Sequence, residues 1–391
     1  MDGRKTNIVV MGVSCFDGMA SSMRVRNLFE PLIEKKIISV NNLIYQKDNK
    51  EPIGKKGSLN NINFEVIGFR LANLFSIFGF FFKGMSFLKK NKIQGYNNII
   101  YNYNAPDIKN IFFILYGRLI GYKIIFDIIE DNQYEAHVGV VNKFRIKTSV
   151  FLFKKSKYFA DAMIGISEHL FKLIQTATKN KIPAYLIPIT VNLKYFKKNI
   201  RVTQKNGIKI FYGGSFGRKD GLEYLIKAFG EVSLVHPTAE LILTGLGHKQ
   251  DMDRVNNEIN KNVNKHMIIY KGFLSINDYY KQLNECDIFC MTRVNSKFAN
   301  AGFPFKLGEF LATGKAVIAT NVGDVPNYLF NGVNALVINP DSVEELIDAL
   351  LILIEHPEKR QALGIEARKT AEHFFDSDTV SMKLLSIFQS V

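Results

Sequence analysis

Short apolar runs alternate with longer amphipathic stretches along the whole of this 391-residue chain. The amphipathic stretches have the spacing of helices. Strands that are apolar throughout are buried on both faces, and with intervening helices they form parallel sheets. The predicted strands are 7–13, 40–45, 64–69, 98–103, 123–128, 162–167 and 184–189, then 208–214, 240–245, 267–272, 287–292, 316–320 and 335–339. The pattern predicts an α/β protein with two Rossmann-like, doubly wound sheets.

A polar segment without clear periodicity, residues 191–206, separates the two series of strands. We therefore predict an N-terminal domain over residues 1–190 and a C-terminal domain over residues 207–375, joined by this linker. The last segment, 376–391, has helical spacing and is expected to pack back on the N-terminal domain.

The composition excludes several classes of protein. A hydrophobic fraction of 47% and a mean hydropathy near zero fit neither a disordered chain nor a polytopic membrane protein. The three cysteines, Cys15, Cys286 and Cys290, are too few for a disulfide framework and lack the spacing of a zinc site. The first residues contain too short an apolar run for a signal peptide. We therefore expect a cytoplasmic protein.

The net charge of +15 is unevenly distributed. Residues 1–200 carry 30 basic and 14 acidic side chains, whereas residues 201–391 carry 21 and 22. A solvated basic surface, an anionic membrane and a phosphorylated ligand would each explain this asymmetry. The chain has no zinc-finger spacing, RNA-binding signature or basic helix interleaved with aromatics, so nucleic acid is not expected as a partner.

Glycines follow the first predicted strand of each series, where open α/β sheets bind their ligands. Gly18 belongs to a small-residue turn that opens a helix, but the dinucleotide fingerprint GxGxxG is absent. The later stretch YGGSFGRKDGLEYLIKAF contains Gly214, Arg218 and Lys219 just before a helix. Glycines, a helix N-terminus and two cations are suited to a diphosphate, although a plain surface turn would have the same composition.

The stretch FANAGFPFKLGEFLATGKAVIATNVGDVPNYL, residues 298–329, places Glu309 within an apolar helical pattern. A carboxylate in such surroundings is costly unless it accepts hydrogen bonds, and a ribose diol can donate two. Lys306 lies three residues earlier, on nearly the same helix face, and can meet a phosphate. Gly302 and Phe303 form the preceding turn, where backbone amides can meet a sugar.

From residue 208 to about 375 the sequence resembles the donor-binding domain of glycosyltransferase family 4, whose members have the GT-B fold. The pieces that carry the resemblance are FYGGSFGRKDGLEYLIKAF, ELILTGLG, MIIYKGFLSINDYYKQLNECDIF, GFPFKLGEFLATGKAVIATNVGDVPNYL and GVNALVINPDSVEELIDAL. The resemblance implies two facing Rossmann-like domains and retaining transfer from a nucleotide-sugar without a metal cofactor. It also implies that Arg218 and Lys219 hold the diphosphate, that Glu309 holds the ribose, and that the backbone at Gly272 faces the base.

One position departs from the family, which often has two glutamates eight residues apart. Ala301 stands eight residues before Glu309, so the donor sugar is expected to be held through Asn300 and backbone amides. In the first half, YKIIFDIIEDNQYEAH stands where such enzymes place residues that face the reacting sugar. By this resemblance Glu130 and Asp131 are candidate catalytic residues together with Lys219. His137 is a candidate acceptor-binding residue or a plain loop residue.

Two DxD strings, Asp251-Met-Asp253 and Asp376-Ser-Asp378, invite a metal-dependent interpretation. Neither follows a strand, and both stand near predicted helix starts, where acidic residues cap helices and suit their dipoles. We therefore expect no bound metal.

Residues 70–92, RLANLFSIFGFFFKGMSFLKKNK, combine aromatic and basic side chains. The run is interrupted too often for a transmembrane helix, and it fits either a buried helix or a segment at a membrane surface. We favour membrane contact by residues within it: Phe81, Phe82, Lys83, Lys89 and Lys90.

The sequence as a whole favours a retaining glycosyltransferase that moves a sugar from a nucleotide-diphosphate donor to a glycan acceptor. The acceptor is either a glycan or a glycan linked to a polyprenyl lipid, and we favour the lipid-linked one. Its expected place is the inner face of a bacterial plasma membrane, in the synthesis of capsule or O-antigen. The alternatives are a nucleotide-sugar epimerase of similar fold and a catalytically inactive scaffold of the same family.

Overall fold

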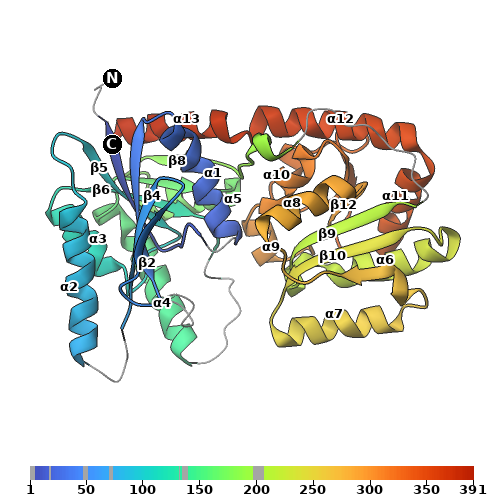
Figure 1. Cartoon of the computed structure of the whole chain (residues 1–391), viewed down its shortest axis with the longest axis horizontal. Coiled ribbons are helices and arrows are strands. Elements are labelled where there is room, and N and C mark those ends of the chain that lie inside the picture. Colours follow the sequence, from blue (N-terminus) through green and yellow to red (C-terminus); the bar gives the residue numbers. More distant parts are fainter. Residues whose placement is uncertain are drawn as a thin grey trace. The chain divides into compact units, whose positions relative to one another are not determined.

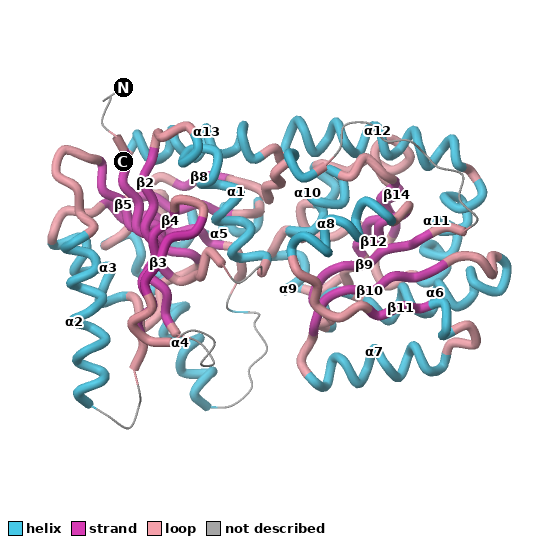
Figure 2. The backbone as a smooth tube through the Cα atoms, in the orientation of Figure 1, coloured by secondary structure: helices cyan, strands magenta, loops and turns pink. Residues whose placement is uncertain are grey.

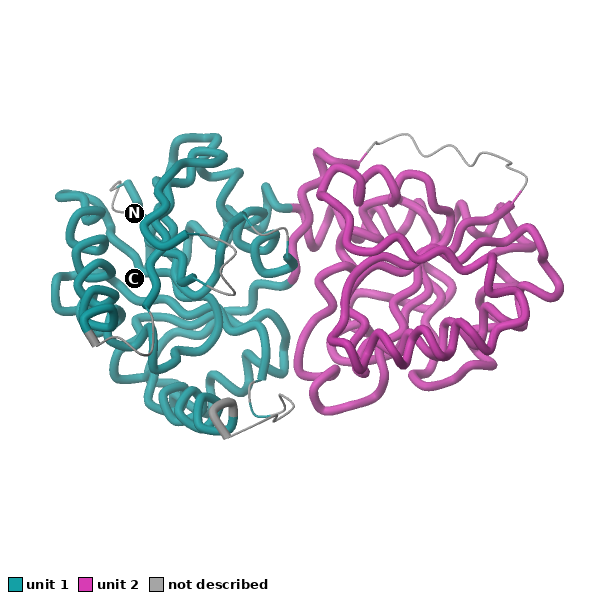
Figure 3. Tube along the Cα trace, turned by 60° about the horizontal axis from the view of Figure 1, so that its bottom comes forward, with its two compact units in different colours: residues 1–188, 377–391 teal, residues 189–376 magenta. Residues whose placement is uncertain are grey.

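The computed structural model describes residues 5–16, 19–46, 52–69, 74–131, 133, 140–196 and 207–391. The chain divides into two compact units, coloured separately in Figure 3. The first unit comprises residues 1–188 and 377–391, and the second comprises residues 189–376.

The first unit is built on a sheet whose described strands run in the order β3-β4-β2-β1-β5-β6-β7-β8 (Figures 1 and 2). Neighbouring strands are parallel except β3 and β4, which pair antiparallel. The strands are β1 (Thr6–Met11), β2 (Ile38–Tyr45), β3 (Lys56–Leu59), β4 (Ile62–Ile67), β5 (Asn97–Tyr103), β6 (Lys123–Ile128), β7 (Ala162–Gly165) and β8 (Ala184–Leu186). All of these except β3 were predicted from the sequence.

The helices of the first unit follow its strands, as expected for a doubly wound sheet. They are α1 (Ala20–Glu34), α2 (Leu74–Lys90), α3 (Ile111–Leu119), α4 (Val140–Lys155) and α5 (Glu168–Thr178), completed by the C-terminal α13 (Ser377–Ser390). The side chain of Ser167 caps α5 by accepting a hydrogen bond from the Leu170 N–H. Apolar side chains of α13, among them Leu384 and Phe388, belong to the same buried core as those of α1, β1 and β5.

A buried ion pair joins α1 to the sheet of the first unit. The Arg24 guanidinium donates to both carboxylate oxygens of Asp127, at 2.7 and 2.8 Å, and Tyr101 donates to the same carboxylate at 2.6 Å. Arg24 also donates to the carbonyls of Ile187 and Pro188, where the chain leaves this unit. Burial alone would lower the pKa of Arg24, but the charge and hydrogen bonds of Asp127 outweigh it and raise that pKa.

The second unit has an all-parallel sheet with the described strand order β11-β10-β9-β12-β13-β14. Its strands are β9 (Lys209–Ser215), β10 (Glu240–Leu246), β11 (Ile268–Tyr270), β12 (Ile288–Met291), β13 (Ala316–Thr320) and β14 (Leu336–Ile338). Its helices are α6 (Leu222–Val235), α7 (Lys249–Lys261), α8 (Ile276–Glu285), α9 (Lys297–Ala301), α10 (Phe305–Ala312), α11 (Val343–Glu355) and α12 (Pro357–Phe374). The strand order reverses between β9 and β12, which is where such sheets bind ligands.

The boundaries of the units differ slightly from the predicted domains. The predicted linker began at residue 191, but Val191 is buried in the second unit, where it pairs with Asp376. The ring of Tyr195 stacks on Tyr280 of α8, with ring centroids 4.7 Å apart. These contacts draw residues 191–196 into the second unit, and the rest of the predicted linker lies outside the described residues.

None of the helices in the described part of the chain is both long and apolar enough to cross a membrane.

Candidate functional site

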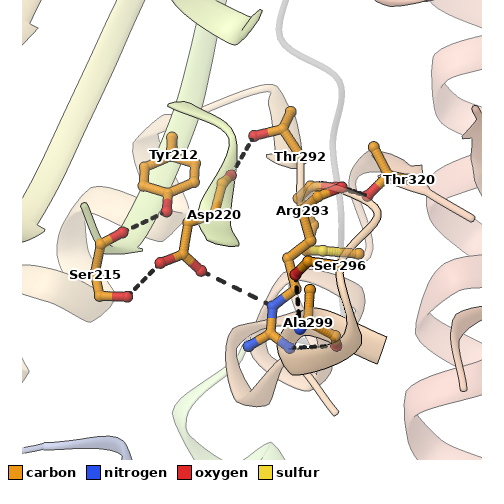
Figure 4. Close-up of polar contacts among 9 residues, drawn as sticks. Tyr212, Ser215, Asp220, Thr292, Arg293, Ser296, Ala299 and Thr320 are labelled. Atoms are coloured by element: carbon orange, nitrogen blue, oxygen red, sulfur yellow. Dashed lines mark hydrogen bonds and ion pairs between the residues drawn. The ribbon is translucent and has the colours of Figure 1, made fainter. Parts of the chain in front are cut away.

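The loops that follow β9 and β12 are held together by a polar network around Asp220 (Figure 4). Ser215 donates to the Asp220 carboxylate at 2.5 Å, and the Arg293 guanidinium lies 3.9 Å from its other oxygen. The Thr292 hydroxyl donates to the Asp220 carbonyl at 3.0 Å, and Tyr212 donates to the Ser215 carbonyl at 2.6 Å. Asp220 therefore fixes the shape of the turn between β9 and α6.

Gly221 ends this turn and has a left-handed backbone, with φ of 62°. A Cβ atom here would collide with the Thr292 carbonyl, so only glycine allows the two loops to approach this closely. Gly221 is also the N-cap of α6, and no side chain caps that end of the helix. The first N–H groups of α6 thus begin at the switch point of the sheet, in an arrangement that suits an anion.

The two predicted diphosphate cations lie in different surroundings on this turn. Arg218 is exposed, whereas Lys219 is half-buried, and its ammonium lies 4.4 Å from the ring centroid of Phe298 on α9. The carbonyl of Lys219 also accepts a hydrogen bond from the N–H of Val294, at 3.0 Å. Lys219 is therefore the cation that the fold holds beside the loop after β12.

Glu309, the predicted ribose ligand, is 1% exposed and already has donors within the protein. The hydroxyl of Tyr279 lies 3.1 Å from one carboxylate oxygen, and the ammonium of Lys306 lies 3.2 Å from the same oxygen. The Tyr280 hydroxyl donates to the other oxygen at 3.4 Å. These contacts explain how a carboxylate is tolerated among apolar side chains without any ligand.

Tyr279 links Glu309 to the end of β9. Its ring lies against Gly213, where an added Cβ would be 3.2 Å from the ring edge, and the Lys306 ammonium lies 3.9 Å from its centroid. Burial, together with the neighbouring Glu309 charge, raises the pKa of Tyr279 well above its usual value. Tyr279 therefore stays a protonated donor to Glu309 at neutral pH.

The remaining residues predicted for the donor are partly engaged in the fold. The Asn300 side chain accepts from the Gly323 N–H at 3.2 Å and donates to Asn295 at 2.9 Å. Gly302 caps α9, and Phe303 is buried and stacked on Tyr328 with ring centroids 5.2 Å apart.

Gly214 lies at the end of β9 and Gly272 just after β11, the strands on either side of β10 in the second unit. Gly214 pairs with Gly245 of β10, and a Cβ atom added to Gly245 would collide with the Gly214 carbonyl. The carbonyl of Gly272 accepts from the Thr244 hydroxyl at 2.7 Å, while Gly272 itself has open space at the position of a Cβ. Together with Lys219, Lys306 and Glu309, these glycines gather at the carboxyl edge of this sheet.

In the first unit, Glu130 and Asp131 follow β6 and line a small pocket with Ala105 and Ser149. Asp131 is buried and lies 3.2 Å from Nε2 of His169, at the start of α5. His169 was not predicted as a site residue from the sequence. Its signal there is its position just after a predicted strand of the same sheet.

Two predicted residues, Gly18 and His137, lie outside the described residues. The residues predicted to touch a membrane lie on α2. Phe82 is 71% exposed, and Lys83, Lys89 and Lys90 are exposed, but Phe81 is half-buried against Phe112 of α3.

Comparison with known families bears on the second unit. Residues 194–370 match the family model described as Glycosyl transferases group 1. The match covers most of the second unit, which is therefore similar to group 1 glycosyl transferases. The Asp220 turn, Lys219, Lys306 and Glu309 all lie inside the matched segment.

Relatives in sequence extend the likeness beyond this domain. An uncharacterized glycosyltransferase of Methanocaldococcus jannaschii is 24% identical over 335 residues, which cover 74% of this chain and 82% of the relative. A GDP-mannose-dependent monoacylated alpha-(1-6)-phosphatidylinositol monomannoside mannosyltransferase of Corynebacterium glutamicum is 28% identical over 178 residues, 44% of each chain.

Solved structures show the fold of the whole chain. Sucrose-phosphate synthase from Thermosynechococcus elongatus superposes with a TM-score of 0.76 at 16% identity, covering 99% of both chains. HepE of Anabaena, solved with UDP and glucose, gives a TM-score of 0.74 at 16% identity over 99% of this chain and all of that one. The fold is GT-B, with two Rossmann-like domains, as the sequence predicted.

Proposed function

We propose that this chain is a retaining glycosyltransferase of family 4 that uses a nucleotide-diphosphate sugar. The observation that carries the proposal is the convergence of Lys219, the uncapped start of α6 and the Lys306–Glu309 pair at one edge of the second sheet. Structures of the same fold have been solved in complex with UDP and with UDP-glucose. This supports a nucleotide-diphosphate sugar as the donor.

In the proposed reaction, the bond between the anomeric carbon and the donor diphosphate breaks while a bond to the acceptor hydroxyl forms on the same face. Negative charge grows on the leaving diphosphate, where Lys219 and the first N–H groups of α6 stabilise it. A diphosphate oxygen takes the proton of the acceptor hydroxyl. Glu309 holds the ribose after Tyr279 has left its carboxylate. Glu130 and Asp131 remain the proposed catalytic residues of the first unit, toward the acceptor.

We further propose a glycan acceptor linked to a polyprenyl lipid, in the synthesis of a bacterial surface polysaccharide at the inner face of the plasma membrane. The excess of basic residues in the first 200 supports this proposal, as does a relative whose name includes a phosphatidylinositol mannoside. An epimerase of similar fold would instead turn over the nucleotide-sugar without any acceptor.

The binding test of this proposal is the substitution Glu309→Gln, which keeps the volume and removes the charge. A hydrogen bond to a charged acceptor contributes about 1–1.5 kcal/mol more than one to a neutral acceptor, so donor affinity should fall about 5- to 10-fold. Titration calorimetry with a panel of nucleotide-diphosphate sugars measures the change. Glutamine is preferred to alanine because alanine would leave Lys306 and two tyrosine hydroxyls without their acceptor.

The matched controls for Glu309→Gln are its two tyrosine partners. Tyr279→Phe removes a donor that competes with the ribose for one carboxylate oxygen, so binding should become tighter. Tyr280→Phe should change binding less, because its contact is longer and its ring is fixed by Tyr195. Unchanged affinity in a folded Glu309→Gln protein would contradict the ribose assignment.

The proposed reaction needs no metal, because Lys219 and the α6 N-terminus supply the positive charge. Among the residues that the structure describes, no three His, Cys, Asp or Glu side chains are placed to hold a metal ion. Of the two DxD strings, Asp251 is paired with Arg254 within α7, at 3.1 Å. Turnover should therefore persist in excess EDTA, and a loss of activity that Mn²⁺ or Mg²⁺ restores would contradict this.

A further inference from the structure

Helix α2 presents an exposed stripe of phenylalanines. Phe75, Phe78 and Phe82 are 88%, 72% and 71% exposed. Their spacing of three and four residues places them on one face of the helix. Exposed aromatic side chains in such a row are unusual in a globular unit and indicate a contact with something else.

Helix α3 presents a second stripe with the same spacing. Phe112, Leu115 and Leu119 are 55%, 49% and 82% exposed. Neither their exposure nor their alignment with α2 was predicted from the sequence.

The two stripes are joined because α2 and α3 lie side by side (Figures 1 and 2). The ring of Phe81 packs edge-on against Phe112, with centroids 5.1 Å apart. A Cβ at Gly84 would collide with the Phe113 ring, so this glycine lets the helices approach closely. We call the six exposed side chains of the two stripes the α2–α3 face: Phe75, Phe78, Phe82, Phe112, Leu115 and Leu119.

The charged side chains of α2 and α3 themselves are all basic. The sequences of α2 and α3 contain no Asp or Glu, and Lys83, Lys89 and Lys90 of α2 are exposed. Asp107, just before α3, accepts hydrogen bonds from the backbone N–H groups of Lys109 and Asn110. An apolar stripe bordered by lysines is complementary to the acyl and headgroup layers of an anionic bilayer.

We propose that the α2–α3 face docks this protein on an anionic lipid bilayer, with both helices in the plane of the interface. Aromatic rings would enter the boundary between headgroups and acyl chains, and the lysines would reach the lipid phosphates. Docking would bring the enzyme to a lipid-linked acceptor, which is found at such a surface. In this respect the inference rests on the proposed function. The binding itself requires no donor or acceptor.

The experiment is co-sedimentation of the full chain with vesicles of phosphatidylcholine, with and without phosphatidylglycerol. The triple substitution Phe75→Ser, Phe78→Ser and Phe82→Ser should lower vesicle affinity about tenfold or more, because it removes the apolar part of the contact. The side chains are exposed, so the unit should keep its thermal midpoint.

The matched control is Phe144→Ser with Phe151→Ser on α4. These rings are 58% and 59% exposed and also stand among basic residues, but they lie outside the α2–α3 face. The control should bind vesicles as the wild type does. If it loses as much affinity as the α2 variant, or if the α2 variant binds normally, the proposed surface is wrong.

The electrostatic contribution to vesicle binding is tested by the substitutions Lys83→Gln, Lys89→Gln and Lys90→Gln. Each lysine near the surface should contribute about fivefold in affinity for phosphatidylglycerol vesicles. Salt should weaken wild-type binding without abolishing it. Failure of the wild type to bind either kind of vesicle, or concentration-dependent dimerisation that masks the face, would overturn the proposal. Nucleotide-sugar binding in the same proteins tests the proposed function separately.

Discussion

Replacing Arg24 with methionine should lower the free energy of unfolding of the first unit by about 3–5 kcal/mol. The substitution leaves the Asp127 carboxylate, which is fully buried, without its counter-charge. It also leaves the Ile187 and Pro188 carbonyls without their donor. Urea unfolding followed by circular dichroism measures the change, and the transition of the second unit should not move.

The control is Arg118→Met, which breaks the Arg118–Asp161 pair in the same unit. The Arg118 side chain is 45% exposed, so its loss should cost no more than about 1 kcal/mol. Arg24→Met combined with Asp127→Leu should recover much of the loss, because both charges are then gone. An Arg24→Met protein as stable as the Arg118→Met control would show that the buried pair contributes little.

The second large effect is expected on turnover. Lys219→Ala should lower kcat about 10²- to 10³-fold and change donor affinity much less, because the ammonium meets charge that grows as the glycosidic bond breaks. Steady-state kinetics at saturating donor, with the thermal midpoint as a check of folding, measures it.

Arg218→Ala is the matched control for Lys219→Ala. Arg218 is the neighbouring cation on the same turn, but it is exposed, whereas Lys219 is held beside Phe298. Loss of the Arg218 side chain should reduce turnover less than loss of the Lys219 side chain. If Arg218→Ala is the more damaging change, the role assigned to Lys219 belongs to Arg218.

The strands buried on both faces could be predicted because their apolar runs are continuous. Strand β3 was missed because all four of its side chains are exposed and its residues, KGSL, form no apolar pattern. The sequence signal for β3 lies instead in the two asparagines that follow it. Asn60 and Asn61 both have positive φ. Consecutive residues of that kind form the two-residue turn of a hairpin.

Positions that are close together within one segment could be predicted from the sequence. Lys306 and Glu309 were predicted to lie on nearly the same helix face, and the ion pair between them agrees with that spacing. The Glu309 partners Tyr279 and Tyr280 come from another helix, about 30 residues away, so no local sequence pattern predicts them. The same holds for His169 beside Asp131, and for Phe112 beside Phe81.

The C-terminal helix α13 has a consequence for the order in which the chain can fold. Its side chains complete the core of the first unit, although residues 189–376 of the second unit come before it in the chain. During synthesis, every residue of the second unit has been made before α13 exists. The first unit therefore cannot complete its core before the second unit has been synthesised. Until then, the apolar surface of α1 and β5 that α13 covers stays without this helix.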